Sequence, residues 1–300
     1  RYQTYHNLKT EDYTPSREVS SDSLLKRIFL LGDIAAGKES EILKYAGTEA
    51  RLLGEKSIVL FLGDQVDRNQ FGKLNNKVEN ALRERLKPYK GLEEKSFFIP
   101  GDKDWGRIGP KAIDEQEAFL QDELSENFKF VPDDGCSGPK VIELADSLVL
   151  IAVNSAWLLS DWDEYRQVNE SCDLRTREQF YYELHDEIKK YYRTHNVIVA
   201  MHHPVMSAGY RGGYFSFNNH IFPIKFKEQR VPLPLPGIGS VATFFRSKIG
   251  SRQDLIHPQY REFSNRMEDF KRDYPGLIFV SAHEQSLQYI KNKAKHYIIS

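Results

Sequence analysis

The amino-acid sequence predicts an α/β protein in which two β-sheets are flanked by helices. Short runs of β-branched and aromatic residues alternate along the chain with longer amphipathic stretches. Several of the short runs are apolar throughout, which is typical of strands buried on both faces. Of the 300 residues, 40% are hydrophobic and 28% are charged, the composition of a globular protein with a substantial core. The alternation therefore favours sheets covered by helices.

The predicted elements can be located along the chain from these patterns. Seven apolar runs predict strands, at 28–31, 58–62, 97–99, 141–144, 148–153, 197–201 and 277–281. Five amphipathic stretches predict helices, at 39–53, 76–87, 112–126, 174–193 and 258–273. Because helices separate most of the strands, we expect buried strands joined by helical connections.

The chain divides into an arm and one large domain. Residues 1–23 are polar without a clear period, which predicts an extended arm or linker, and residues 24–300 form the domain. A segment at about 204–257 interrupts the alternation of elements, with paired glycines at Gly212 and Gly213 and a proline-rich run at 231–237. Insertions of this length are either lids and binding surfaces or partly ordered surface excursions. Its apolar stretch at 239–245 either faces a partner or membrane, or packs onto the sheet.

Charge and cysteine content exclude some classes of protein. The formal net charge is -1, from 42 basic and 43 acidic residues, so we expect no nucleic-acid partner. Cys136 and Cys172 are too few for a disulfide framework; they form one bridge if the protein is exported, or they are two unrelated thiols. No apolar run reaches the ~18 residues of a membrane span, and no secretory signal is visible. The chain begins with Arg1, so this absence decides nothing about export.

Small polar clusters follow five of the predicted strands, where open α/β sheets place their ligand sites. The clusters are Gly32-Asp33, Gly63-Asp64-Gln65-Val66-Asp67-Arg68, Gly101-Asp102-Lys103-Asp104, His202-His203-Pro204 and Ala282-His283-Glu284-Gln285. A single Gly-Asp after a strand is usually a turn. Carboxylate oxygens bind hard divalent cations, and imidazole suits zinc, iron and manganese. Five such clusters in register therefore predict a transition-metal site.

The five clusters resemble those of the calcineurin-like metallophosphoesterases. The family blocks read Gly-Asp-x-His or Gly-Asp-x-Gly, Gly-Asp-x-x-Asp or Gly-Asp-x-x-Tyr, Gly-Asn-His-Asp/Glu, a His before Pro, and Gly-His-x-His, and their order and spacing match across 28–290. Three further stretches, at 154–157, 212–214 and 286–289, are similar to a bacterial cell-envelope branch near the purple acid phosphatases. The resemblance implies a four-layer α/β/β/α sandwich of two mixed β-sheets flanked by helices. It also implies two metals, about 3.5 Å apart, that share a bridging carboxylate and activate water.

The resemblance assigns roles to individual residues. It implies metal ligands at Asp33, Asp64, Asp67, Asp102, His202 and His283. Asp64 corresponds to the bridging ligand, and Asp33 belongs to the first metal, with Asp67 standing where the purple acid phosphatases use Tyr. Asp102 replaces the family Asn, while His202 and His283 match the imidazoles of the second metal. The expected cofactor is a divalent metal, namely manganese, iron or zinc, in the form of two ions, one or none.

Three departures from the family pattern weaken the first half of this site. Ala35 and Gln285 stand where the family supplies imidazoles, so only carboxylates remain for the first metal, and oxygen-only sites favour magnesium, calcium or manganese. Lys103 replaces the family His. It lies beside Asp102 and supplies the positive charge that a metal once provided, or it binds a substrate phosphate, or it points to solvent. His203 either contacts substrate or is structural. Lys103 and His203 are the candidate catalytic residues.

These departures favour a degenerate member of the family, with impaired or absent phosphatase activity and a structural or partner-binding role in the bacterial cell envelope. The alternative is an active phosphoester hydrolase that uses one or two metals. On the first reading, the 204–257 insertion binds an envelope protein or an outer-membrane β-barrel, and on the second the partner is a phosphoester substrate. The resemblance to an exported branch suggests a periplasmic or outer-membrane location.

Overall fold

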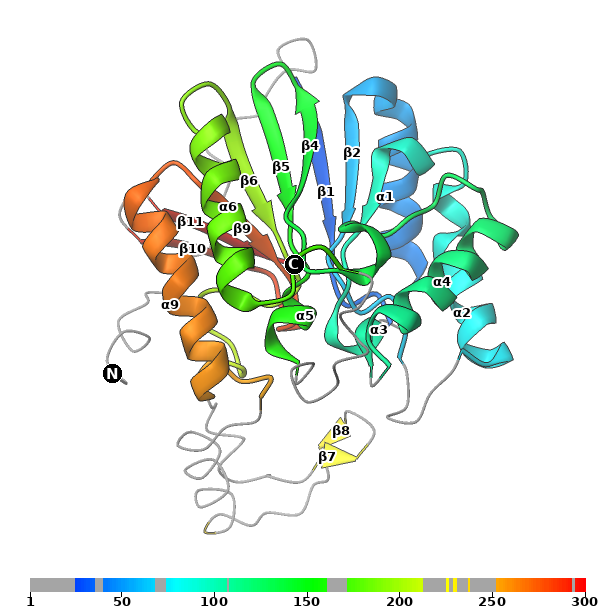
Figure 1. The fold of residues 1–300 in the computed structure, drawn as a ribbon. Helices are drawn as coiled ribbons and strands as arrows, with labels where there is room; N and C mark the ends of the chain where they lie inside the picture. Colours follow the sequence, from blue (N-terminus) through cyan, green and yellow to red (C-terminus); the bar gives the residue numbers. More distant parts are fainter. Residues whose placement is uncertain are drawn as a thin grey trace.

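The computed structural model describes residues 25–35, 40–67, 74–106, 108–160, 172–212, 225–226, 229–230, 237, 252–292 and 295–300. The described elements form two sheets in the middle of the molecule with helices on both outer sides (Figure 1). The predicted arm at 1–23 and most of the 204–257 insertion lie outside the described residues. Among the described residues, no helix is both long and apolar enough to cross a membrane.

The smaller sheet has three parallel strands in the order β1-β2-β3, namely β1 (Arg27–Leu31), β2 (Ser57–Phe61) and β3 (Ser96–Phe98). Helices α1 (Ser40–Leu53) and α2 (Asn76–Leu86) lie between these strands in the sequence, and α4 (Pro110–Glu123) follows them. All three helices lie on the same outer side of the molecule (Figure 1). Parallel strands require such crossover connections, because each chain must return to the same end of the sheet.

The larger sheet has six strands in the order β10-β11-β9-β6-β5-β4. The strands are β4 (Lys140–Ala145), β5 (Leu148–Ala152), β6 (Asn196–Ala200), β9 (Ile278–Ser281), β10 (Gln288–Asn292) and β11 (Lys295–Ile299). The two edge pairs, β4 with β5 and β10 with β11, are antiparallel, and the inner pairs are parallel. Helices α6 (Arg177–Tyr191) and α9 (Pro258–Asp273) lie on the side opposite α1, α2 and α4 (Figure 1).

The two sheets pack face to face because side chains alternate along each strand. Ile58 and Leu60 of β2 belong to one buried apolar cluster with Leu150 of β5 and Ile198 of β6, so this cluster lies between the sheets. Val59 and its neighbours belong to a second cluster that includes residues of the helices. The arrangement confirms the predicted α/β fold of two sheets flanked by helices. The larger sheet is mixed, as expected, whereas the smaller one is parallel throughout its described strands.

Most element boundaries follow from local signals. Asn75 accepts hydrogen bonds from the backbone N–H groups of Lys77 and Val78 at the start of α2, and Thr176 forms a capping box with Gln179 at the start of α6. All seven predicted strands and all five predicted helices are present, with ends shifted by a few residues at most. The remaining elements are α3 (Asp102–Trp105), α5 (Ser155–Leu159), β7 (Lys225–Phe226), β8 (Gln229–Arg230), β10, β11 and the 3-10 turns at Gly54–Lys56, Lys87–Tyr89, Glu93–Lys95 and Asp133–Gly135.

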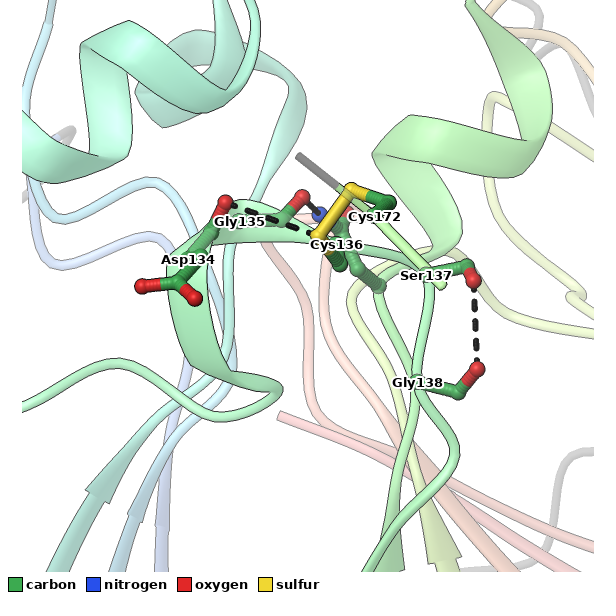
Figure 2. Close-up of a disulfide and its surroundings, with 7 residues drawn as sticks. Asp134, Gly135, Cys136, Ser137, Gly138 and Cys172 are labelled. Atoms are coloured by element: carbon green, nitrogen blue, oxygen red, sulfur yellow. Dashed lines mark hydrogen bonds between the residues drawn. A yellow bond between two sulfur atoms is a disulfide. The ribbon is translucent and has the colours of Figure 1, made fainter. Parts of the chain in front are cut away.

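Cys136 and Cys172 form a disulfide, with their Cα atoms 5.6 Å apart (Figure 2). The bridge joins the segment before β4 to the segment before α6. The neighbouring carbonyl oxygens of Gly135 and Ser137 accept hydrogen bonds from the side chain and the backbone N–H of Asn154, at 2.7 and 3.0 Å. Of the two alternatives for the cysteines, the structure therefore has the bridge.

Candidate metal centre

Five of the six predicted metal ligands meet where strands of both sheets end. Asp33, Asp64, His202 and His283 follow β1, β2, β6 and β9, and Asp102 begins α3 just after β3. Ligand atoms of Asp33, Asp64 and His202 all lie within 4.8 Å of one another. The same holds for the group of Asp102, His202, His203 and His283. His202 belongs to both groups, so the two groups form one continuous cluster.

Unusual backbone conformations allow the loops to approach each other. Asp33, Asp64 and His283 have φ angles of 51°, 57° and 73°, a region that residues other than glycine seldom adopt. Such conformations are held by their surroundings and often occur at functional sites. Gly63 and Gly101 are also required, because an added Cβ would lie 2.3 Å from Nδ1 of His202 and 2.4 Å from the backbone N of Asp64, respectively.

Backbone carbonyl oxygens determine which ring nitrogen donates a hydrogen bond in each of the two predicted imidazole ligands. Nδ1 of His202 lies 2.7 Å from the carbonyl oxygen of Leu62, and Nε2 of His283 lies 3.1 Å from that of Gln253. A carbonyl oxygen only accepts, so both of these ring nitrogens donate. The other ring nitrogens, Nε2 of His202 and Nδ1 of His283, then present lone pairs and lie 3.1 Å apart. Metal-bound histidines are commonly oriented in this way.

Carboxylate oxygens approach the same two ring nitrogens, Nε2 of His202 and Nδ1 of His283. Electron-rich atoms this close together repel each other unless a cation lies between them. Oδ1 of Asp102 lies 3.1 Å from Nε2 of His202 and 3.3 Å from Nδ1 of His283, while Oδ1 of Asp64 lies 3.6 Å from Nε2 of His202. Two nitrogens and two carboxylate oxygens are a donor set that zinc, iron and manganese accept. Asp102, His202 and His283 thus offer ligand atoms that lie together at the position that the sequence predicts for the second metal, and Asp64 approaches them through His202.

In the absence of an ion, a proton can take its place. Burial lowers the pKa of His202, but the charges of Asp64 and Asp33 and the hydrogen bond that His202 donates to Asp102 raise it to about 10. Burial raises the pKa of Asp102, but hydrogen bonds with His202 and His283 hold it well below its usual range. The arrangement therefore favours an ionised Asp102 beside a positive charge, whether that charge is a proton or a metal.

The first half of the predicted site contains a lysine in place of imidazoles. Nζ of Lys103 lies 3.2 Å from Oδ2 of Asp64, and the backbone N–H of Lys103 donates to Oδ1 of the same carboxylate at 3.0 Å. Burial lowers the pKa of Lys103, but the charge of Asp64 and the hydrogen bond with it outweigh burial. The net pKa is raised, so the amine stays protonated. Burial and the charge of Asp102 raise the pKa of Asp64 to about 6, against the opposing effects of His202 and Lys103. The sequence hypothesis placed the ammonium beside Asp102; in the structure its partner is Asp64.

The other positions of the first half contribute no imidazole. Oδ2 of Asp33 accepts a hydrogen bond of 2.7 Å from the backbone N–H of His283. Ala35 is buried and donates its backbone N–H to the carbonyl oxygen of Asp64, and Gln285 is exposed. Asp67 is exposed and belongs to neither ligand group, so the structure does not bring it to the centre with the other predicted ligands.

His203 is fully buried beside the predicted ligands. Its Nδ1 lies 2.9 Å from Oγ of Ser155, its Nε2 lies 2.8 Å from Oε1 of Gln253, and Nε2 is 4.0 Å from Oδ1 of Asp102. Burial lowers the pKa of His203 well below its usual value, and the neighbouring His283 and His202 act in the same direction. The ring is therefore a neutral imidazole with a hydrogen-bond partner at each nitrogen.

Two supporting residues were not predicted from the sequence. Asp104 accepts hydrogen bonds from the backbone N–H groups of Gly101 and Val66, at 2.9 and 3.1 Å, and so ties the loop of Asp102 to that of Asp64. Burial raises its pKa to about 7, with the charge of Asp64 adding to the effect. Asp104 could have been predicted from the sequence, because it is the last residue of the Gly-Asp-Lys-Asp block that follows a predicted strand. Gln253 lies inside the insertion, where no motif marks it.

The fold and this cluster define a two-sheet α/β protein with a buried Asp/His metal centre. The sequence model of the calcineurin-like phosphoesterases matches residues 26–241. The chain therefore belongs to the calcineurin-like phosphoesterase family, as the resemblance implied.

Three solved structures match most of this chain at low sequence identity, each with a TM-score below 0.5. GAP50, the anchor in the inner membrane complex of Plasmodium, has a TM-score of 0.48 and 13% identity, over 91% of this chain and 70% of that one. The phosphopantetheinyl hydrolase of Mycobacterium tuberculosis has a TM-score of 0.41 and 10% identity, over 92% and 89% of the two chains. A putative 5′-nucleotidase of Staphylococcus aureus has a TM-score of 0.48 and 11% identity, over 91% and 48%. No curated protein matches the chain.

Proposed function

We propose that this chain is a degenerate metallophosphoesterase that holds a single divalent ion and has impaired or absent phosphatase activity. The ion, manganese, iron or zinc, binds to Asp64, Asp102, His202 and His283. The observation that carries the proposal is the ion pair between Lys103 and Asp64, in which Nζ lies 3.2 Å from Oδ2. The carboxylate that bridges two metals in the family is thus already neutralised by a side chain.

Charge balance supports one ion over two. Asp33, Asp64 and Asp102 supply three negative charges when ionised, and one divalent ion together with the ammonium of Lys103 supplies three positive charges. A second divalent ion would add two positive charges to a half-site whose candidate ligand group contains no imidazole besides His202, which the first ion already uses. Uncompensated charge in a buried site is costly, so the second ion is disfavoured.

The loss of one ion has a direct chemical consequence. A bound divalent ion supplies positive charge to a phosphoryl oxygen and lowers the pKa of water, whereas a two-metal site also stabilises the leaving oxygen. Among the residues that the structure describes, Lys103 is a cation beside the centre that could face a phosphoryl group, and its side chain is 28% exposed. Altering only the residues that orient metal ligands costs 10–100-fold in affinity or activity, and the departures at Ala35, Lys103 and Gln285 concern the ligand positions themselves.

The exposure of Lys103 also favours a second candidate function, a slow phosphoester hydrolase that uses one ion. In this case the ammonium of Lys103 binds a non-bridging phosphate oxygen while His202 and His283 hold the ion. The substrate class would be a phosphoester. The two candidates differ in turnover and share the same predicted metal content.

We further propose a location in the cell envelope, in the periplasm or at the outer membrane, with partner binding through the 204–257 insertion. The disulfide between Cys136 and Cys172 supports an oxidising compartment, because such bridges form and persist outside the reducing cytosol. The partner expected there is an envelope protein or an outer-membrane β-barrel. Replacing residues 213–251 with a short Gly/Ser linker should abolish partner capture in a cross-linking experiment on intact cells. Unchanged capture would exclude the insertion as the binding element.

One preparation tests the metal and activity proposals together. The protein is purified without chelators, its metal content is measured by mass spectrometry, and p-nitrophenyl phosphate and bis-p-nitrophenyl phosphate are tested as substrates with added Mn²⁺. We expect one ion per chain, lost in His202→Ala, and turnover far below that of a two-metal phosphoesterase. Two tightly held ions per chain would refute the single-ion centre, and rapid turnover would refute impaired activity.

A further inference from the structure

Gln253 contacts two imidazoles of the metal centre at the same time. Its backbone carbonyl oxygen lies 3.1 Å from Nε2 of His283, and its side-chain Oε1 lies 2.8 Å from Nε2 of His203. The two histidines follow different strands, β9 and β6, and their ring centroids are 4.5 Å apart. One residue of the insertion therefore bridges side chains that two separate strand ends supply.

We infer that Gln253 is a positioning residue of the metal centre, which fixes the tautomers of His203 and His283 and makes the end of the insertion part of the site. The inference rests on the proposed single-ion centre for its effect on metal binding. The effect on the imidazoles does not depend on a bound metal.

The hydrogen bonds around His203 select one tautomer. Oγ of Ser155 accepts from the backbone N–H of His203 at 3.0 Å, which leaves its hydroxyl proton free to donate to Nδ1 at 2.9 Å. Nε2 then carries the proton and donates it to Oε1 of Gln253. Without this acceptor, Nδ1 could instead carry the proton and donate to Ser155. Gln253 thus decides between two arrangements that Ser155 alone would allow.

The end of the insertion that carries Gln253 is anchored to its beginning. The backbone N–H of Leu255 donates to the carbonyl oxygen of Arg211 at 3.0 Å, and Nη1 of Arg211 lies 3.7 Å from Oδ1 of the buried Asp254. The backbone N–H of Arg211 donates in turn to Oε2 of Glu284, the residue after His283. These contacts close the base of the insertion beside the centre, so the position of Gln253 is coupled to that of His283.

Loss of the Gln253 side chain should affect the two histidines differently. His283 keeps its partner, because the carbonyl oxygen belongs to the backbone. His203 loses the acceptor at Nε2, so its proton can move to Nδ1 and be donated to Oγ of Ser155. Nε2 then presents a lone pair 4.0 Å from Oδ1 of Asp102, and the repulsion between these two atoms disturbs a carboxylate that the proposed ion needs. A general loosening of the structure would disturb both rings alike, so the split between them identifies a positioning role.

The experiment uses three variants of the full chain. Gln253→Met keeps the size of the side chain but removes the acceptor, Gln253→Glu keeps an acceptor oxygen, and Gln259→Met is the matched control. Gln259 lies in α9, and its side-chain amide donates to the carbonyl oxygens of Leu158 and Ser160, at 3.4 Å. Imidazole tautomers are measured by long-range ¹H–¹⁵N spectra of the metal-free proteins, and Mn²⁺ affinity is measured by calorimetry.

We expect wild type and Gln259→Met to show His203 and His283 protonated at Nε2. Gln253→Met should shift His203 toward the Nδ1-protonated form, leave His283 unchanged, and weaken Mn²⁺ binding about tenfold, at the lower end of the effect of such outer partners. Gln253→Glu should keep the Nε2 tautomer of His203 and move its N–H resonance downfield. An unchanged His203 in Gln253→Met overturns the inference, as does an unchanged resonance in Gln253→Glu if the Met variant fails to fold. If the wild type binds no Mn²⁺, the proposed single-ion centre fails, and the spectra alone decide the role of Gln253.

Discussion

Lys103 engages both oxygens of the Asp64 carboxylate. Its ammonium group lies 3.2 Å from Oδ2, and its backbone N–H donates to Oδ1 at 3.0 Å. Asp64 is almost fully buried, so this pairing supplies much of the positive charge that its carboxylate needs. The residue that would bridge two ions in a complete phosphoesterase is thus held by the side chain that replaces the family histidine.

Removal of the Lys103 ammonium should raise the affinity of the centre for divalent ions. Lys103→Met keeps the length of the side chain and removes its repulsion of a nearby cation. Relief of only about 1.4 kcal/mol would strengthen binding tenfold, so we expect at least that change in the Mn²⁺ dissociation constant by calorimetry. Lys111→Met, on the exposed surface of α4, is the control and should bind as wild type does. Equal affinities of the two variants would show that Lys103 does not oppose metal binding.

Restoration of the family block should increase turnover. The double substitution Asp102→Asn and Lys103→His recreates Gly-Asn-His-Asp, which removes one negative and one positive charge and returns a histidine to position 103. We expect the rate constant for bis-p-nitrophenyl phosphate with Mn²⁺ to rise at least about tenfold, within the 10²–10⁴-fold that a positioned acid–base group can contribute. A variant that is folded and metal-loaded but no faster would place the defect at Ala35 and Gln285.

Metal binding should stabilise the folded protein. An ion that binds only the native state at 100 times its dissociation constant adds about 2.7 kcal/mol, which for a domain of this size raises Tm by roughly 5 °C. We expect Mn²⁺ to produce such a rise in a thermal melt and a chelator to reverse it. His202→Ala removes a ligand common to both groups and should abolish the response. A rise that persists in this variant would place the ion elsewhere.

Loss of the disulfide should lower the free energy of unfolding. The bridge closes a loop with a sequence separation of 36, which corresponds to about 3–4 kcal/mol in the chain-entropy account. We expect Cys136→Ser with Cys172→Ser to reduce urea stability by about 2–4 kcal/mol, and a reductant to have the same effect on wild type. The double variant is its own control, because reductant should leave it unchanged. Equal stability of oxidised and reduced wild type would contradict this prediction.

The predicted strands show how far local pattern reaches. Apolar runs such as 58–62 and 197–201 identify strands because each run, buried on both faces, has no competing local interpretation. β10 and β11 lie at one edge of the larger sheet and were not predicted. Lys, Gln, Asn and His interrupt their apolar residues, so neither strand forms an apolar run. α3 and α5 were missed because a helix of four or five residues carries no measurable period.

In the candidate metal centre, too, some features could be predicted from local sequence and others could not. The sequence by itself determined that Asp33, Asp64, Asp102, His202 and His283 stand at strand ends, since each follows a recognisable strand and parallel strands in a covered sheet bring such ends together. Only the tertiary structure decided that Lys103 pairs with Asp64, that Asp67 stays outside, and that Gln253 reaches His203 and His283. The physical reason is that periodicity records burial along one segment. A contact between residues 39 or 50 positions apart depends instead on how the packed segments aim their side chains.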